Sequence, residues 1–64
     1  MVVDDFIKAY DDDAIDVVLH NSYSGLTIIA DIEVIRKDQN LWFLRDADVK
    51  SWNIDGCRIR IEYT

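Results

Sequence analysis

The apolar residues near the start of the chain recur three or four positions apart, the spacing of one helix face. They are Val2, Val3, Phe6, Ile7 and Tyr10. Asp4 and Asp5 fall where a first helical turn favours negative charge. Three consecutive aspartates at 11–13 then interrupt the pattern, because aspartate is a poor helix-interior residue and like charges repel. The sequence therefore predicts a short opening helix that ends at these aspartates.

Alternation of apolar and polar residues follows, which is typical of β-strands. A first strand is predicted from Ile15 to His20, and the turn-forming residues 21–25 come directly after it. The alternation is most regular from 26 to 35, where the predicted core face is formed by Leu26, Ile28, Ala30, Ile32 and Val34. The apolar and aromatic run 41–44 predicts a third strand, which would pair with the second across the polar residues 36–40.

The last hairpin has the strongest local signal, because Asp55-Gly56 is a preferred two-residue turn of type I′ and both flanks alternate. Pairing Ile54 with Cys57 across this turn puts both on the core face and leaves Arg58 and Arg60 on the other face. We therefore expect a single α+β domain, residues 1–64. It would consist of a short N-terminal helix followed by an antiparallel sheet of about five strands arranged in hairpins.

This register predicts an apolar patch on the face of the sheet that lies away from the core. Its members are Ile29, Ile35, Trp42 and Leu44. One short helix cannot cover both faces, and exposed apolar patches usually mark contact with another chain. Alternatively, the sheet curls and buries the patch internally. Because a chain of 64 residues buries a small share of its surface, we expect a homo-oligomer, a dimer or tetramer, with Trp42 near the centre of the interface.

Charge is distributed unevenly along the chain. The net charge is −6, and residues 1–35 carry eight acidic and one basic side chain, whereas residues 36–64 carry five and six. A negative total disfavours direct binding to DNA, and favours a basic protein partner or simple solubility. No apolar run approaches 18 residues and the first residues lack the features of a signal peptide. We therefore expect a cytoplasmic protein without membrane contact.

Clustered carboxylates are the only group of side chains in the sequence that could take part in chemistry. Asp11, Asp12, Asp13 and Asp16 could hold a divalent cation, with Asp11 and Asp13 as candidate metal ligands. The spacing matches no familiar cation loop, so a solvated acidic turn is the simpler interpretation. We expect no bound metal, no cofactor and no catalytic residues, and the sequence gives little support for enzymatic activity.

The single histidine and the single cysteine would be the only possible Cys-His catalytic pair. We expect His20 to face solvent and Cys57 to be a buried core residue. Arg58 and Arg60 are candidate phosphate contacts, and basic residues beside an aromatic ring can bind single-stranded nucleic acid. In the expected register, however, Trp52 projects from the face opposite the two arginines, so the three would not form one stacking platform.

Three segments, "VDDFIKAYDD", "IDVVLHN" and "LRDADVKSWNIDGCRIRIEYT", resemble small accessory proteins carried by phages, prophages and plasmids of gut Firmicutes. Those proteins commonly open with a Val-x-Asp-Phe-Ile helix, continue into Ile-Asp-Val and close with two strands joined by a turn. The resemblance covers most of the chain, although the segment from Asn40 to Val49 is shorter than in many similar proteins. It implies a mobile-element protein, a class that includes anti-CRISPR and other counter-defence inhibitors.

Three functions remain open at this point. The first, which we favour, is an inhibitor in the bacterial host cytoplasm that presents residues 11–16 to a basic nucleic-acid-binding defence protein such as a CRISPR nuclease. The second is an oligomeric protein that binds, nicks or relaxes DNA with metal-assisted chemistry. The third is a structural or regulatory phage protein.

Overall fold

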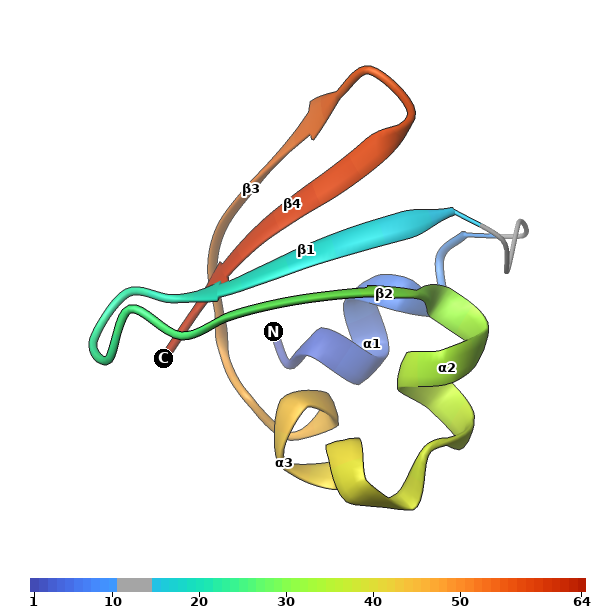
Figure 1. Ribbon diagram of the computed structural model, residues 1–64, viewed down its shortest axis with the longest axis horizontal. Coiled ribbons are helices and arrows are strands. Elements are labelled where there is room, and N and C mark those ends of the chain that lie inside the picture. Colours follow the sequence, from blue (N-terminus) through green and yellow to red (C-terminus); the bar gives the residue numbers. More distant parts are fainter. Residues whose placement is uncertain (11–14) are drawn as a thin grey trace.

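The structure, a computed structural model, describes residues 1–10 and 15–64 and has a four-stranded mixed sheet with short helices (Figure 1). Along the chain the elements are α1 (Val3–Ile7), β1 (Asp16–Asn21), β2 (Thr27–Asp31), α2 (Ile32–Lys37), the 3₁₀-helix η1 (Gln39–Leu41), α3 (Trp42–Arg45), β3 (Val49–Asp55) and β4 (Arg58–Tyr63). The strand order is β2-β1-β4-β3, and β1 runs parallel to β4 while the other neighbours are antiparallel. The α+β class is confirmed, but the sheet is smaller than expected and contains a parallel pair.

The opening helix and the first strand lie where the sequence predicts them. In α1, Val3, Phe6 and Ile7 are buried against the sheet, and in β1 the buried residues are Val17 and Leu19. The predicted turn after β1 is also present. Asn21 organises this turn, because its Oδ1 accepts hydrogen bonds from the backbone N–H groups of residues 23 and 24 at 2.8 and 3.0 Å.

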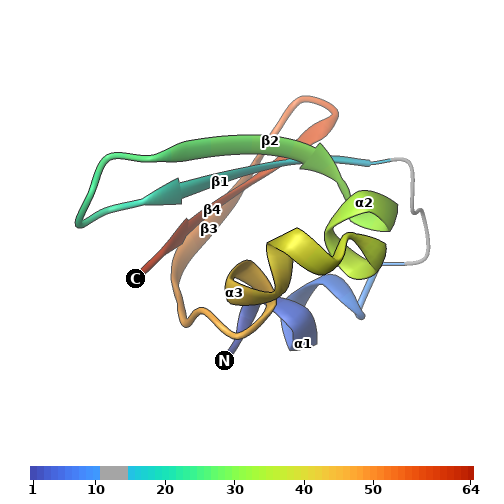
Figure 2. The same cartoon turned by 60° about the horizontal axis from the view of Figure 1, so that its bottom comes forward.

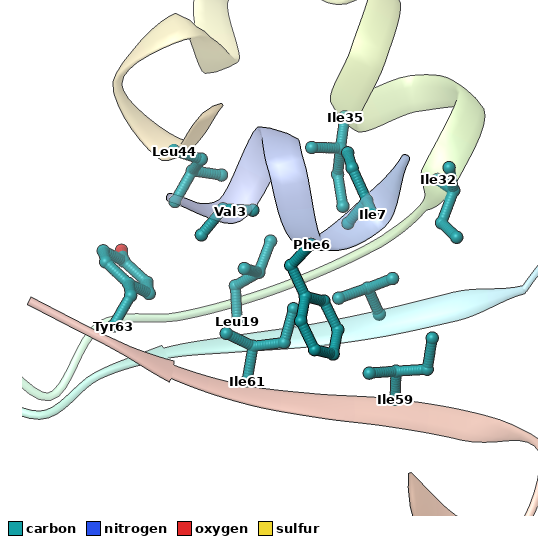
Figure 3. Packing of buried hydrophobic residues seen from close by; sticks show 11 residues of the cluster. Val3, Phe6, Ile7, Leu19, Ile32, Ile35, Leu44, Ile59, Ile61 and Tyr63 are labelled. Carbon is teal, nitrogen blue, oxygen red and sulfur yellow. The ribbon is translucent and has the colours of Figure 1, made fainter. Parts of the chain in front are cut away.

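The core lies between the helices and the two central strands. Figure 3 shows α1 seated above β1 and β4, with Phe6 and Leu19 close to Ile61. The register pairs Val17 with Ile59 and Leu19 with Ile61, so apolar side chains of the parallel pair share one face. All four are at most 2% exposed. The parallel pair is central in the sheet, and each of its strands has a neighbour on both sides.

The second half of the long strand predicted over 26–35 is helical instead. β2 ends at Asp31, whose side chain caps α2 by accepting a 2.8 Å hydrogen bond from the backbone N–H of Val34. Ile32 and Ile35 are three positions apart and both are fully buried, which is the spacing of a helix face. Val34, predicted in the core, is 42% exposed. The apolar alternation was compatible with both structures, and the cap determines where the strand stops.

The third predicted strand, residues 41–44, is also wrong, since this segment forms the end of η1 and the helix α3. Asp38 begins the segment by accepting a 2.8 Å hydrogen bond from the N–H of Asn40. Arg45 holds it in place, because its Nη1 donates to the carbonyl oxygens of Ile35 and Asp38 at 2.8 and 2.9 Å. Leu44 is thereby buried and Trp42 is left 61% exposed.

The C-terminal hairpin is confirmed, but its register differs by two residues from the prediction. Asp55 pairs with Arg58 and Ile54 with Ile59, so Gly56 and Cys57 form the turn. Gly56 has a φ of +62°, and Cys57, like every other described non-glycine residue, does not have a positive φ, which matches a type II′ turn and not type I′. Cys57 is therefore exposed and not in the core. A shift by two preserves the faces, so Ile59 still points into the core.

The cap at Asp31 provides a direct test of the boundary between β2 and α2. We expect Asp31→Ala to lower the free energy of unfolding by about 1 kcal/mol, because the backbone N–H of Val34 loses its acceptor. Asp31→Asn should retain nearly all of the stability, since asparagine is an equally good cap. Urea denaturation followed by circular dichroism gives both values. Equal loss in the two variants would contradict the capping role.

Candidate functional site

The described helices all lie on one face of the sheet, as Figure 2 shows, and the opposite face is not covered by any described element. The register of the four strands sorts the side chains of this uncovered face, here called the open face, into three rows. The first row contains Asp31, Asp16, Arg58 and Asp55. The middle row contains Ile29, Val18, Arg60 and Asn53. The last row contains Thr27, His20, Glu62 and Ser51.

The first row of the open face is acidic. Three carboxylates, those of Asp31, Asp16 and Asp55, accompany the single cation of Arg58. Arg58 Nε lies 3.9 Å from Asp16 Oδ2, and both side chains are about half exposed at 56% and 52%. A pair so well solvated contributes little to stability. The row therefore presents an excess of negative charge to solvent along one end of the sheet.

The remaining charged groups of the open face are linked through Glu62. His20 Nδ1 donates to Glu62 Oε2 at 2.7 Å, and Arg60 Nε lies 3.9 Å from the other carboxylate oxygen. A shallow depression beside them is lined by Ser51, Asn53, Arg60 and Glu62, together with Trp52. The polar side chains that line this depression can donate hydrogen bonds to the side chains of another protein and accept hydrogen bonds from them. Among residues 1–10 and 15–64, no three histidine, cysteine or acidic side chains converge as a metal site would need.

The sequence-predicted site residues are distributed as follows. Asp11, Asp12 and Asp13 lie outside the described residues. Asp16 is in the acidic row. Arg58 and Arg60 lie on the open face, and each has a carboxylate oxygen at 3.9 Å. These acidic neighbours offset the charge that a phosphate would need. Trp52 is on the face opposite the arginines, in agreement with the expected faces of this hairpin.

The predicted oligomer interface is not a single surface. Ile35 and Leu44 are fully buried in the core, whereas Ile29 is 58% and Trp42 61% exposed. Ile29 belongs to the open face, and Trp42 lies on α3, on the other side of the sheet. The prediction that these four residues share a face assumed that side chains alternate between the two faces of a strand. Residues 35–44 include helices, in which side chains do not alternate in this way.

Sequence reasoning missed Asp31 and Asp55 as members of the acidic row, and missed the contact between His20 and Glu62. Asp31 is aligned with Asp16 by the pairing of β1 with β2. The place of Asp55 and the contact between His20 and Glu62 depend on the pairing of β1 with β4, whose paired residues are 42 positions apart in the chain. No local pattern predicts such a pairing. The alternation of β1 and β4 taken separately does indicate which residues of each strand share a face.

None of the described helices is long and apolar enough to cross a lipid bilayer. Searches of protein-family models, of curated proteins and of solved structures find no match to this chain.

Proposed function

We propose that this protein is a binding protein without catalytic activity, which attaches to a basic surface of a partner protein through its open face. The observation that carries the proposal is the acidic row, in which Asp31, Asp16 and Asp55 are placed across the sheet with Arg58 alone to offset them. Asp16 and Asp55 are exposed, and Asp31 is half-buried and caps α2 through Oδ1, so a partner can reach the row. Carboxylates in such a row attract a complementary charged surface and accelerate its association.

The charge of the whole chain supports a basic partner over nucleic acid. A net charge of −6 repels phosphates, and the two arginines of the open face each have an acidic neighbour. The resemblance to phage and plasmid accessory proteins indicates which class of protein the partner belongs to. On that basis the partner is a host defence protein that handles nucleic acid, such as a CRISPR nuclease, and the acidic row occupies part of its basic groove.

A triple substitution tests the acidic row. Asp16→Asn, Asp31→Asn and Asp55→Asn together remove three charges, while asparagine preserves the cap of α2 and suits the hairpin turn. In a plaque assay on a host that carries a CRISPR nuclease, the unmodified chain should protect the phage. The triple variant should bind the purified nuclease about tenfold more weakly or worse, a loss of at least about 1.4 kcal/mol.

The matched control removes the same charge from the helical side of the molecule. Asp4→Asn, Asp5→Asn and Glu33→Gln should preserve protection, because these residues lie on α1 and α2. A further variant with asparagine at Asp11, Asp12 and Asp13 tests the predicted acidic segment. Absence of protection by the unmodified chain, or equal loss in the triple variant and its control, would refute the proposal.

The same samples distinguish the DNA-acting alternative. Purified protein incubated with supercoiled plasmid and Mg²⁺ should leave the plasmid band unchanged if the protein binds only a partner protein. Nicked or relaxed plasmid that disappears with EDTA would instead support metal-assisted action on DNA.

A further inference from the structure

β3 is an edge strand that is paired on its outer side only at its beginning. Val2 forms a bridge with Asp48, and the backbone N–H of Val49 donates to the carbonyl oxygen of Met1 at 2.7 Å. The chain then turns away into α1. From Lys50 to Asp55 no described segment pairs with the outer side of β3. Unpaired N–H and C=O groups on an edge are a ready template for another strand.

Two large apolar side chains accompany this free edge. Trp52 is 53% and Ile54 is 61% exposed, although both lie on the face of the sheet that carries the core. Figure 1 shows the reason, since the outer end of the β3–β4 hairpin extends beyond the helices. The Phe6 ring lies against the Trp52 ring, with the ring centroids 5.2 Å apart. An exposed tryptophan and isoleucine beside an unpaired strand edge are typical of a contact surface.

We propose that two copies of this chain pair through their β3 edges, antiparallel and about a two-fold axis at Asn53, to form one continuous eight-stranded sheet. In this register Trp52 of each copy lies opposite Ile54 of the other on the core-side face. On the open face, Ser51 of each copy lies opposite Asp55 of the other. Apolar side chains thus meet apolar ones, and polar side chains meet polar ones.

The free edge is complementary to itself, which identifies a second copy as the occupant. Pairing about Asn53 brings Trp52 and Ile54 of one copy against Ile54 and Trp52 of the other, so all four exposed apolar side chains meet in one contact. The neighbouring register, with Trp52 opposite Trp52, would place Ile54 opposite Lys50. An apolar residue facing a charge is the poorer match, so the Asn53-centred register is preferred.

The pairing also compensates for the small size of the domain. A chain of 64 residues covers only part of its apolar surface with its own helices, and association is a common way to complete the burial. This interface replaces the one expected from the sequence, which placed Trp42 at its centre. The inference does not rest on the proposed function, although Asp55 of the acidic row lies at the end of the same edge.

The first test is the mass of the protein in solution. Light scattering on the eluate of a sizing column, at micromolar concentration, should give twice the 7.5 kDa of one chain. A mass of one chain would overturn the proposal. Ile54→Glu should return the mass to one chain, because it puts a charge opposite Trp52 of the second copy. Trp42→Glu is the matched control, since Trp42 is equally exposed at 61% but lies on α3, and it should leave the dimer intact. The opposite result would overturn the β3 interface.

A cross-link tests the register. In a chain that also carries Cys57→Ser, Asn53→Cys should form a disulfide-linked dimer on mild oxidation, because the two-fold axis brings residue 53 of each copy together. Ser51→Cys in the same background is the control and should remain without a cross-link, since Ser51 lies opposite Asp55 of the second copy. Circular dichroism confirms that each variant is folded. Cross-linking of Ser51→Cys in place of Asn53→Cys would overturn the Asn53-centred register.

Discussion

Leu19→Ala is expected to remove most of the free energy of unfolding of this domain. Leu19 is fully buried in the central strand β1, where the register places it between Ile28 and Ile61. Removing such a side chain typically costs about 2–5 kcal/mol, because the cavity closes only in part. A single core of this size supplies about 3–5 kcal/mol in total. The expected loss is therefore comparable with the whole stability of the domain.

Ile29→Ala is the matched control for that substitution. Ile29 lies in the neighbouring strand on the opposite face and is 58% exposed, so its truncation should change the free energy of unfolding by no more than about 0.5 kcal/mol. Urea denaturation followed by circular dichroism, at one fixed protein concentration, compares the two. Similar losses in both variants would mean that the open face is covered and that the burial described for β1 is wrong.

Ile35→Asp should abolish folding, whereas Val34→Asp should be tolerated. Ile35 is fully buried in α2, and an unpaired carboxylate there would have to be protonated or would unfold the helix, at a cost of more than about 3 kcal/mol. Val34 is 42% exposed in the first turn of the same helix, where a negative charge is favourable. The same denaturation experiment measures both.

This pair of variants also distinguishes the helix from the strand that the alternation predicted. A strand over 26–35 would place Val34 in the core and Ile35 on the other face. Under that arrangement Val34→Asp would be the damaging substitution. Tolerance of Ile35→Asp with unfolding of Val34→Asp would therefore refute α2.

The acidic character of the candidate site could be predicted from the sequence, but the residues that form the acidic row could not. The acidic excess of the first half of the chain is a property of the sequence, and Asp16 was identified from it. Asp31 and Asp55 join Asp16 only through strand pairing. Their alignment needs contacts between segments far apart in the chain, which local patterns do not specify.

The sequence by itself determined the elements whose signals are local. The spacing of Val3, Phe6 and Ile7 indicates the opening helix, the alternation in β1 indicates a strand, and the residues around Gly56 indicate a hairpin. The hairpin faces were also correct, since a register shift of two residues preserves side-chain parity.

Only the tertiary structure decided the state of residues 32–45 and the neighbour of β1. Alternating apolar residues from Ile32 onward can be satisfied by a strand or by a short helix, and the sheet needs helices to cover its core face. The cap at Asp31 and the bonds from Arg45 to the end of α2 stabilise the helical choice. The parallel pairing of β1 with β4 follows from the same requirement, because the two most apolar strand faces are buried together only when they are adjacent beneath those helices.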